Sequence, residues 1–312
     1  SLILPGAHVT VTGKSRLLAP RTPIFRSSDR SVVLTFLGRG FTALVKHKGK
    51  LYDLDSAGSQ KGRKLAEVPL PDRWLDCYEN DARKRSLAMG VALGSKLLER
   101  FADEVEAIEW VQSVFAKANH VYTAQLNFVL KIKSFVVASG SSPSWDQGPS
   151  CPMSAEEQLT EFQRWTSPED MGLWHLFDDC FTGSILGIAS VGTLCYGNSW
   201  AGKTYNKGLT YWYAWSSSQN WLTFAHEVGH NFGAYHSFEA GQGTTGGIMD
   251  YGDGMLNGVY QFNELRKSEI CSTIQWALSN PLCTAIEFDQ PECGNAVMED
   301  GEECECQAGT EC

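Results

Sequence analysis

The chain lacks any apolar run long enough to cross a membrane. It is also poor in positive charge, with 26 Lys and Arg against 36 Asp and Glu and a formal net charge of −10. This balance argues against binding to nucleic acid or to an anionic membrane surface. No Asn-x-Ser/Thr sequence is present, so N-glycosylation is not expected. No signal peptide opens the chain at Ser1, and we expect a piece of a longer secreted or membrane-anchored protein, with any anchor outside these residues.

Cysteine, in contrast, is abundant, and four of the ten cysteines fall within the last twenty residues. This density among acidic residues and glycine is typical of disulfides formed in an oxidising compartment, which favours secretion or the extracellular face of a membrane. A zinc knuckle is the alternative, but Cys304 and Cys306 are only two positions apart and no histidine lies near them.

Residues 1–72 are predicted to form a small β-rich segment. Apolar and β-branched runs at 31–36, 41–45 and 49–54 read as short strands separated by glycine. Residues 56–72 are rich in Gly, Ser, Lys and Pro, which is typical of a linker.

Residues 73–287 show strands alternating with helices, which implies an α/β layer domain. The predicted elements are a strand at 87–93, a helical apolar stripe from Leu97 to Phe115, a half-buried strand from Leu126 to Ile132, a helix capped by Ser154, a strand at 185–191, and helices at 219–231 and 268–278.

Residues 226–236 read His-Glu-Val-Gly-His-Asn-Phe-Gly-Ala-Tyr-His. His226 and His230 are four apart, so on a helix they project from one face and can hold one ion. Glu227 adjoins the first ligand, where its carboxylate can polarise a water on the metal. Gly233 stands where the chain leaves the helix with positive φ, and this turn can return His236 as a third ligand.

Three imidazoles leave one coordination position open, which is typical of a catalytic rather than a structural zinc site. Met249 follows downstream, in Gly-Gly-Ile-Met-Asp-Tyr. A helix with stray surface histidines is the alternative, but five fixed positions and a downstream Met rarely coincide. The other four histidines have no ligand spacing and are expected in ordinary surface or packing roles: His8, His47, His120 and His175.

The extended motif with its downstream Met resembles the metzincin clan of zinc peptidases. Residues 223–233 look like the active-site helix of its ADAM (adamalysin, reprolysin) family, and residues 186–192 are similar to that family's edge strand above the cleft. The stretch from Leu98 to Tyr122 resembles its first long helix, and residues 293–306 look like the opening of a disintegrin domain. The likeness covers about residues 86–312.

The resemblance implies a metzincin catalytic domain at 73–287, with a twisted mixed sheet, long helices, a zinc helix and a Met-turn. A truncated, disulfide-rich start of a disintegrin-like domain would follow at 288–312. Residues 1–72 stand where the family keeps its inhibitory prodomain, so the chain is a candidate zymogen.

The activity implied is that of a zinc endopeptidase that hydrolyses internal peptide bonds of protein or peptide substrates. Glu227 would be the general base, Met249 an apolar floor beneath the histidines, and residues 185–191 an edge that holds an extended substrate by strand addition. The alternative is a silent peptidase whose disintegrin-like region serves adhesion. The intact ligands and Glu227 favour the enzyme.

Two departures from the family pattern leave alternatives open. Ser237 follows the third histidine where Asp is usual, and Tyr251 stands near the Met as in the astacin and serralysin branches. Tyr251 is therefore a candidate fifth ligand or oxyanion donor, or else packs under the cleft. In the disintegrin-like start, the oxygen side chains of Asn295, Glu299 and Glu302 suit a calcium site or a solvated acidic loop.

Two features bear on latency. The Cys77 thiolate is a candidate cap on the zinc, since soft sulfur binds zinc well, with a disulfide as the alternative. The basic triplet Arg83–Arg85 is a candidate processing site for a proprotein convertase, or a solvated charge run.

Overall fold

The computed structural model describes residues 71–138, 143–181, 183–197, 200–213 and 217–289, and the backbone of six strands between Ile3 and Asp55. In these parts of the chain, no helix has the length and apolar character needed to cross a membrane. The predicted calcium residues Asn295, Glu299 and Glu302 lie outside the described residues.

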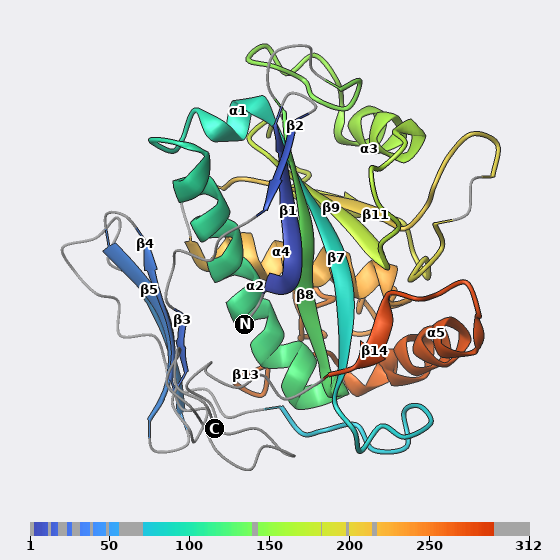
Figure 1. Cartoon of the computed structure of the whole chain (residues 1–312). Helices are drawn as coiled ribbons and strands as arrows, with labels where there is room; N and C mark the ends of the chain where they lie inside the picture. The colour runs from blue at the N-terminus through green and yellow to red at the C-terminus, as the bar shows by residue number, and fades with distance from the viewer. Residues whose placement is uncertain are drawn as a thin grey trace, which may run out of the picture.

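The principal sheet is mixed and has eight strands in the order β10-β11-β9-β7-β8-β1-β2, with β14 paired to β7 (Figure 1). Its strands are β1 (Ile3–Val11), β2 (Lys14–Leu17), β7 (Arg85–Leu93), β8 (Phe128–Val137), β9 (Leu173–Asp178), β10 (Gly187–Ala189), β11 (Lys207–Tyr211) and β14 (Ile286–Phe288). The strands from β11 through β9 and β7 to β8 are parallel, whereas β10 runs antiparallel at the edge. The predicted edge strand at 185–191 is thus confirmed, but is shorter.

The N-terminal strands belong to two sheets. Strand β1 pairs in parallel with β8, while β3 (Ile24–Arg26), β4 (Val32–Leu37), β5 (Gly40–His47) and β6 (Lys50–Asp55) form a separate antiparallel sheet. The β-rich character predicted for residues 1–72 is confirmed. That residues 1–72 form a unit separate from a domain beginning at residue 73 stays a prediction.

The helices lie on both faces of the principal sheet. They are α1 (Ser95–Leu98), α2 (Glu104–Leu126), α3 (Ala155–Arg164), α4 (Ser217–Asn231) and α5 (Lys267–Ser279), with the 3₁₀ turn η1 (Glu264–Arg266) and the hairpin β12 (Met255–Leu256) and β13 (Val259–Tyr260) after α4. Helices α2 and α4 share one core, in which the rings of Phe115 and Phe224 are 4.6 Å apart. Helix α3 packs on the other face through Leu159 and Phe162.

The prediction of one continuous helical stripe from Leu97 to Phe115 is wrong, because the stretch is divided between α1 and α2. Asp103 adopts an extended backbone and its side chain accepts a hydrogen bond from the Glu106 amide, so a new helix begins at Glu104. Helix α2 ends at Leu126 and is followed by Asn127 in the left-handed region at φ 56°, so β8 starts at Phe128 rather than Leu126. Strand β8 is almost fully buried instead of half-buried, because β7 and β1 flank it in the sheet and α2 packs against it.

Three disulfides join distant parts of residues 73–287: Cys77–Cys271, Cys151–Cys180 and Cys195–Cys283. The prediction of Cys77 as a latency thiol is wrong, because a sulfur bonded to Cys271 has no thiolate to offer a metal. The alternative, a disulfide, is confirmed.

The basic triplet Arg83–Arg85 packs against the folded chain rather than forming a free charge run. Arg85 opens β7 and is 9% exposed, and the guanidinium groups of Arg83 and Arg85 lie 3.6 and 4.2 Å from the centre of the Phe288 ring. The Lys84 ammonium pairs with Asp289 at 2.9 Å. These contacts hold the triplet against β14 and the residue that follows it.

Candidate active site

Three histidine rings converge at the end of α4. His226 and His230 lie one helical turn apart and are 9% and 7% exposed, and His236 approaches from the segment that follows the helix. One nitrogen of each ring lies within 4.8 Å of the other two, and no other such group of potential ligands occurs in the part of the chain that the structure describes. His230 Nε2 and His236 Nε2 are only 3.0 Å apart. The structure therefore brings the three predicted ligands together.

A glycine makes this convergence possible. Gly233 has φ +101°, a conformation that residues with a Cβ rarely adopt, and its amide donates to the carbonyl of His230 at 2.8 Å. A Cβ at this position would lie 2.1 Å from Thr273 Oγ1 on α5. The reversal at Gly233 therefore allows the close approach of α5 and returns the chain toward α4.

The hydrogen bonds of the rings orient them for a cation. His226 Nδ1 donates to the carbonyl of Ile248, and His230 Nδ1 donates to that of Ala234, both at 2.7 Å. Each ring therefore keeps Nε2 as an acceptor aimed at the centre of the group. Burial lowers the pKa of His226 to about 3 and that of His230 to about 4, and also lowers that of His236. Three neutral imidazoles fit the donor set that zinc prefers.

Glu227 lies beside the histidines against the edge strand. It is 5% exposed, and a Cβ at Gly187 of β10 would lie 2.8 Å from its Oε1, so only glycine fits there. Its Oε2 has no hydrogen-bond partner among the described residues. Burial raises the pKa of this carboxyl well above its usual range. A buried, unpartnered carboxylate oxygen next to a ligand group marks a place for a water or a substrate.

Met249 lies beneath α4 and is fully buried. A Cβ at Gly229 would be 2.6 Å from Met249 Sδ, which explains the glycine inside the helix. The main chain around Met249 also positions the ligands. The Ile248 carbonyl accepts from the ring of His226, and the Met249 carbonyl accepts from the amide of Ser237, the residue after His236, at 2.9 Å.

Asp250 organises the loop between the third histidine and Met249, a role that the sequence analysis did not identify. Its Oδ1 accepts from the amides of Gly243 and Tyr251 at 2.6 and 2.8 Å, and its Oδ2 accepts from Gly246 at 2.7 Å. Although burial raises the pKa of this carboxyl, these backbone hydrogen bonds lower it by more. The sequence signal for this role is an Asp within a glycine-rich loop, because Asp side chains commonly accept hydrogen bonds from nearby backbone amides in turns.

Tyr251 lies at the rim of the site. Its hydroxyl is 3.3 Å from His236 Nε2, and its ring meets those of His236 and Phe238 edge to face at 4.9 Å. The side chain is 55% exposed, which excludes the alternative of packing under the cleft. Whether its hydroxyl takes part in chemistry stays a prediction.

The main chain of His236 is held by Arg266, which the motif did not reveal. The guanidinium donates to the His236 carbonyl at 3.2 Å and forms ion pairs with Glu239 and Glu269. Glu269 also accepts from the amide of Tyr235 at 2.9 Å. The third ligand is therefore fixed by α5 and η1 as well as by the Gly233 turn.

The edge strand and the end of α4 are joined by Asn231. Its side-chain amide donates to the carbonyls of Ser190 and Lys207 at 3.0 and 3.1 Å, and the Gly192 amide donates to the carbonyl of His230 at 2.8 Å. Among the described strands β10 pairs only with β11, so its other edge is unpaired, and its Gly187 lies against Glu227. The end of the ligand helix is therefore tied to an edge strand that adjoins Glu227.

Two sequence relatives and one solved structure illustrate what this chain is similar to. The chain is 23% identical over 326 residues to a disintegrin and metalloproteinase domain-containing protein B of Aspergillus fumigatus, covering 94% of the chain and 41% of the relative. It is 34% identical over 106 residues to the human disintegrin and metalloproteinase domain-containing protein 10, covering 29% of the chain and 14% of the relative. A structure of metalloproteinase-II from Bacteroides fragilis matches with 14% identity and a TM-score of 0.49, covering 87% of the chain and 86% of that structure.

The chain spans less than half the length of these curated relatives. A model of reprolysin-type sequences, described as metallopeptidase family M12, matches residues 83–260 and thus more than half of the chain. This span includes the histidine group, Glu227 and Met249. The family implies zinc, and the neutral imidazoles at the site fit that ion. The chain therefore belongs to metallopeptidase family M12.

Proposed function

We propose that this protein is a zinc-dependent endopeptidase that cleaves internal peptide bonds of protein substrates. The supporting observation is the set of three imidazoles on one centre, with the unpartnered Glu227 carboxylate beside them. Zinc held by His226, His230 and His236 supplies Lewis acidity that lowers the pKa of water and polarises a carbonyl.

Glu227 carries the proton in this reaction. Its Oε2 accepts a proton from the attacking water and later gives it to the nitrogen of the departing amine. Because burial raises the pKa of Glu227, the protonated form is accessible between the two steps. The attack is by water, so no covalent acyl-enzyme forms.

Strand β10 and Tyr251, on either side of the histidines, would position the substrate. The outer edge of β10 offers backbone groups to an extended peptide, which places the scissile carbonyl between Glu227 and the histidines. The Tyr251 hydroxyl, 3.3 Å from His236 Nε2, is placed to donate to the oxygen that gains charge as water adds.

The test uses a denatured protein substrate and the full chain. We expect cleavage that a zinc chelator abolishes and added zinc restores. Glu227→Gln keeps the size of the side chain and is expected to bind one zinc per chain while losing at least about 100-fold in kcat. Unchanged turnover by Glu227→Gln would exclude Glu227 as the base, and turnover insensitive to chelation would exclude the metal.

Latency and location are further parts of this proposal. Three disulfides suit folding in the secretory pathway, which supports a secreted or surface protein. Residues 1–72 are proposed to act as a prodomain, so activity should rise when a protease cuts within 56–72. Equal activity of cut and uncut protein would refute latency.

The alternative function is adhesion through the disintegrin-like residues 293–306, which the Cys-rich sequence favours. Cell binding that Glu227→Gln leaves intact, in a protein with no peptidase activity even after cutting within 56–72, would support that alternative.

A further inference from the structure

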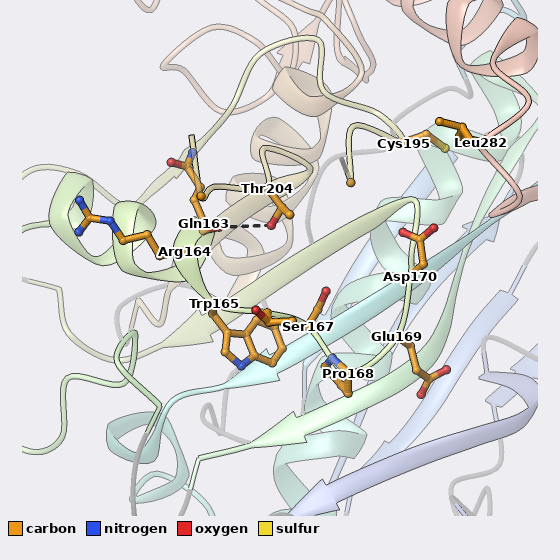
Figure 2. Close-up of a pocket in the computed structure, with 13 residues that line it drawn as sticks. Gln163, Arg164, Trp165, Ser167, Pro168, Glu169, Asp170, Cys195, Thr204 and Leu282 are labelled. Atoms are coloured by element: carbon orange, nitrogen blue, oxygen red, sulfur yellow. Dashed lines mark hydrogen bonds between the residues drawn. The ribbon is translucent and has the colours of Figure 1, made fainter. Parts of the chain in front are cut away.

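A cavity of about 450 Å³ opens between the segment after α3, the loop that joins β10 to β11, and Leu282 (Figure 2). Its wall combines the aromatic Trp165 with polar side chains that include Arg164, Glu169 and Asp170. None of these residues belongs to the zinc site described above.

The cavity begins where the edge strand ends. Ser190 follows β10 directly, and its hydroxyl accepts a hydrogen bond from Gln163 Nε2 at 3.0 Å. Gln163 also lines the cavity, and its carbonyl accepts from the Thr204 amide at 2.8 Å. An extended peptide that runs along β10 and past Ser190 therefore reaches this cavity.

A ridge of four aromatic rings comes from residues next to the cavity lining and from α5; it consists of Trp200, Tyr205, Tyr196 and Trp276, of which Tyr205 is half-buried and the others are exposed. The ring centres of successive members are 6.2, 6.3 and 6.1 Å apart. Trp200 is 69% exposed at the tip of a tight hairpin whose two turn residues, Ala201 and Gly202, have positive φ. Tyr196 and Trp276 are 41% and 42% exposed. Large rings presented to solvent in a row are typical of a binding surface.

The free charges at this ridge and cavity favour a cation. Neither Glu169 nor Asp170 has an ion-pair partner among the described residues, whereas the Arg164 guanidinium is paired with Glu161. Two further cations lie nearby: Lys203, beside Trp200, and Lys207, whose ammonium donates to the Trp165 carbonyl at 3.1 Å and lies 4.7 Å from the centre of the Trp165 ring. Lys207 is fully buried, so of these two only Lys203 is open to a ligand. In Figure 2 the Asp170 carboxylate is turned toward the segment of Cys195, and a Cβ at Gly197 would lie 2.9 Å from its Oδ1.

We propose that the aromatic ridge and the cavity form an exosite for a lysine- or arginine-rich segment of the protein substrate, flanking the bond that is cut. Aromatic faces and a carboxylate both attract ammonium and guanidinium groups. The net charge of −10 attracts the same segment at longer range. An acidic segment meets the same rings but is repelled by Asp170. This inference rests on the proposed function.

The test compares three fluorogenic peptides with an identical cleavable core. One is the core alone, and the others add a tail of alternating Gly and Lys, or Gly and Glu, at either end. The full chain is expected to cleave the best Lys-tailed peptide with a kcat/KM about fivefold above that of its Glu-tailed partner. Asp170→Asn and Trp200→Ala should bring this ratio close to one without changing cleavage of the core. Glu109→Gln, a charge control on α2, should preserve the ratio.

Equal cleavage of Lys- and Glu-tailed peptides by the wild type overturns the exosite, as does a ratio that Asp170→Asn and Trp200→Ala leave unchanged. Both results leave the peptidase proposal intact, since the core is still cleaved. The tails alone are also titrated by fluorescence anisotropy against Glu227→Gln. Should the core not be cleaved even after a cut within 56–72, the proposed function fails, and tighter binding of the Lys tail, lost in the Asp170→Asn background, decides the exosite separately.

Discussion

The reversal at Gly233 is the local feature on which the third ligand most depends, and Gly233→Ala tests it. An alanine at φ +101° carries a backbone penalty of about 1–2 kcal/mol. Its Cβ would also lie 2.1 Å from Thr273 Oγ1 and 3.0 Å from the carbonyl oxygen of Glu269. The threonine can rotate only by giving up its hydrogen bond to that carbonyl, and the backbone of α5 is held by its helix. Overpacking of this kind costs about 1–3 kcal/mol more.

A matched control exists in Gly192, which also has positive φ, at +68°. A Cβ there meets nothing closer than 4.0 Å, so Gly192→Ala carries the backbone penalty without the clash, or about 1 kcal/mol. The measurement is the free energy of unfolding in guanidinium chloride for both variants, followed by zinc affinity in competition with a chelating dye. Gly233→Ala should lose about 1–3 kcal/mol more stability than Gly192→Ala and should bind zinc more weakly.

The double variant Gly233→Ala/Thr273→Ala separates the cost of the clash with Thr273 from the cost of the backbone conformation. Removing Oγ1 should recover part of the lost stability and leave the backbone penalty, which a double-mutant cycle measures as a coupling energy. The reasoning is refuted if Gly233→Ala is no less stable than Gly192→Ala, or if it binds zinc as tightly as the wild type.

Three other predictions follow from the contacts around the site. A convertase should not cut the native protein at 83–85, and after denaturation such a cut should leave fragments that Cys77 still joins, giving one band on a non-reducing gel and two on a reducing gel. Burial raises the pKa of Asp178 from 3.8 to about 6, so the folded state binds the extra proton and the contribution of Asp178 to stability should fall by about 2 kcal/mol between pH 4 and pH 7. Asp178→Asn should lack this slope in unfolding curves, and an identical slope would refute the assignment. Arg266→Ala should weaken zinc binding by about tenfold in dye competition, because the His236 main chain loses a partner.

The zinc helix and its neighbours were predictable because their signals are local. The spacing of His226 and His230, the glycine after them and the Met downstream fix an ordered motif within 24 residues. Ser154 likewise begins α3 with a complete capping box, in which its side chain and that of Glu157 each accept from the other's amide. Such features depend on residues within one or two turns, so the sequence alone carries them.

What the sequence did not reveal depends on contacts between distant residues. Strands β9 and β11 were not predicted, since both are buried on both faces and lack the alternation that marks a half-exposed strand. The anchoring of α4 was equally hidden: the hydroxyl of Tyr122 on α2 donates to the carbonyl of Ala225 at 2.9 Å, across 103 positions. The partner of Cys77 was also beyond reach, because pairing follows from the fold and not from spacing.

Asn231 shows how a local motif and contacts with distant residues together place the ligand helix against the edge strand. The motif fixes its position directly after His230, but its role comes from Ser190 and Lys207, 41 and 24 positions away. Its fully buried amide holds the end of the ligand helix against the edge strand that borders Glu227. If this contact aligns substrate and base, Asn231→Ala should lower kcat more than it lowers zinc affinity. A loss of zinc in proportion to the loss of activity would instead assign Asn231 to ligand geometry alone.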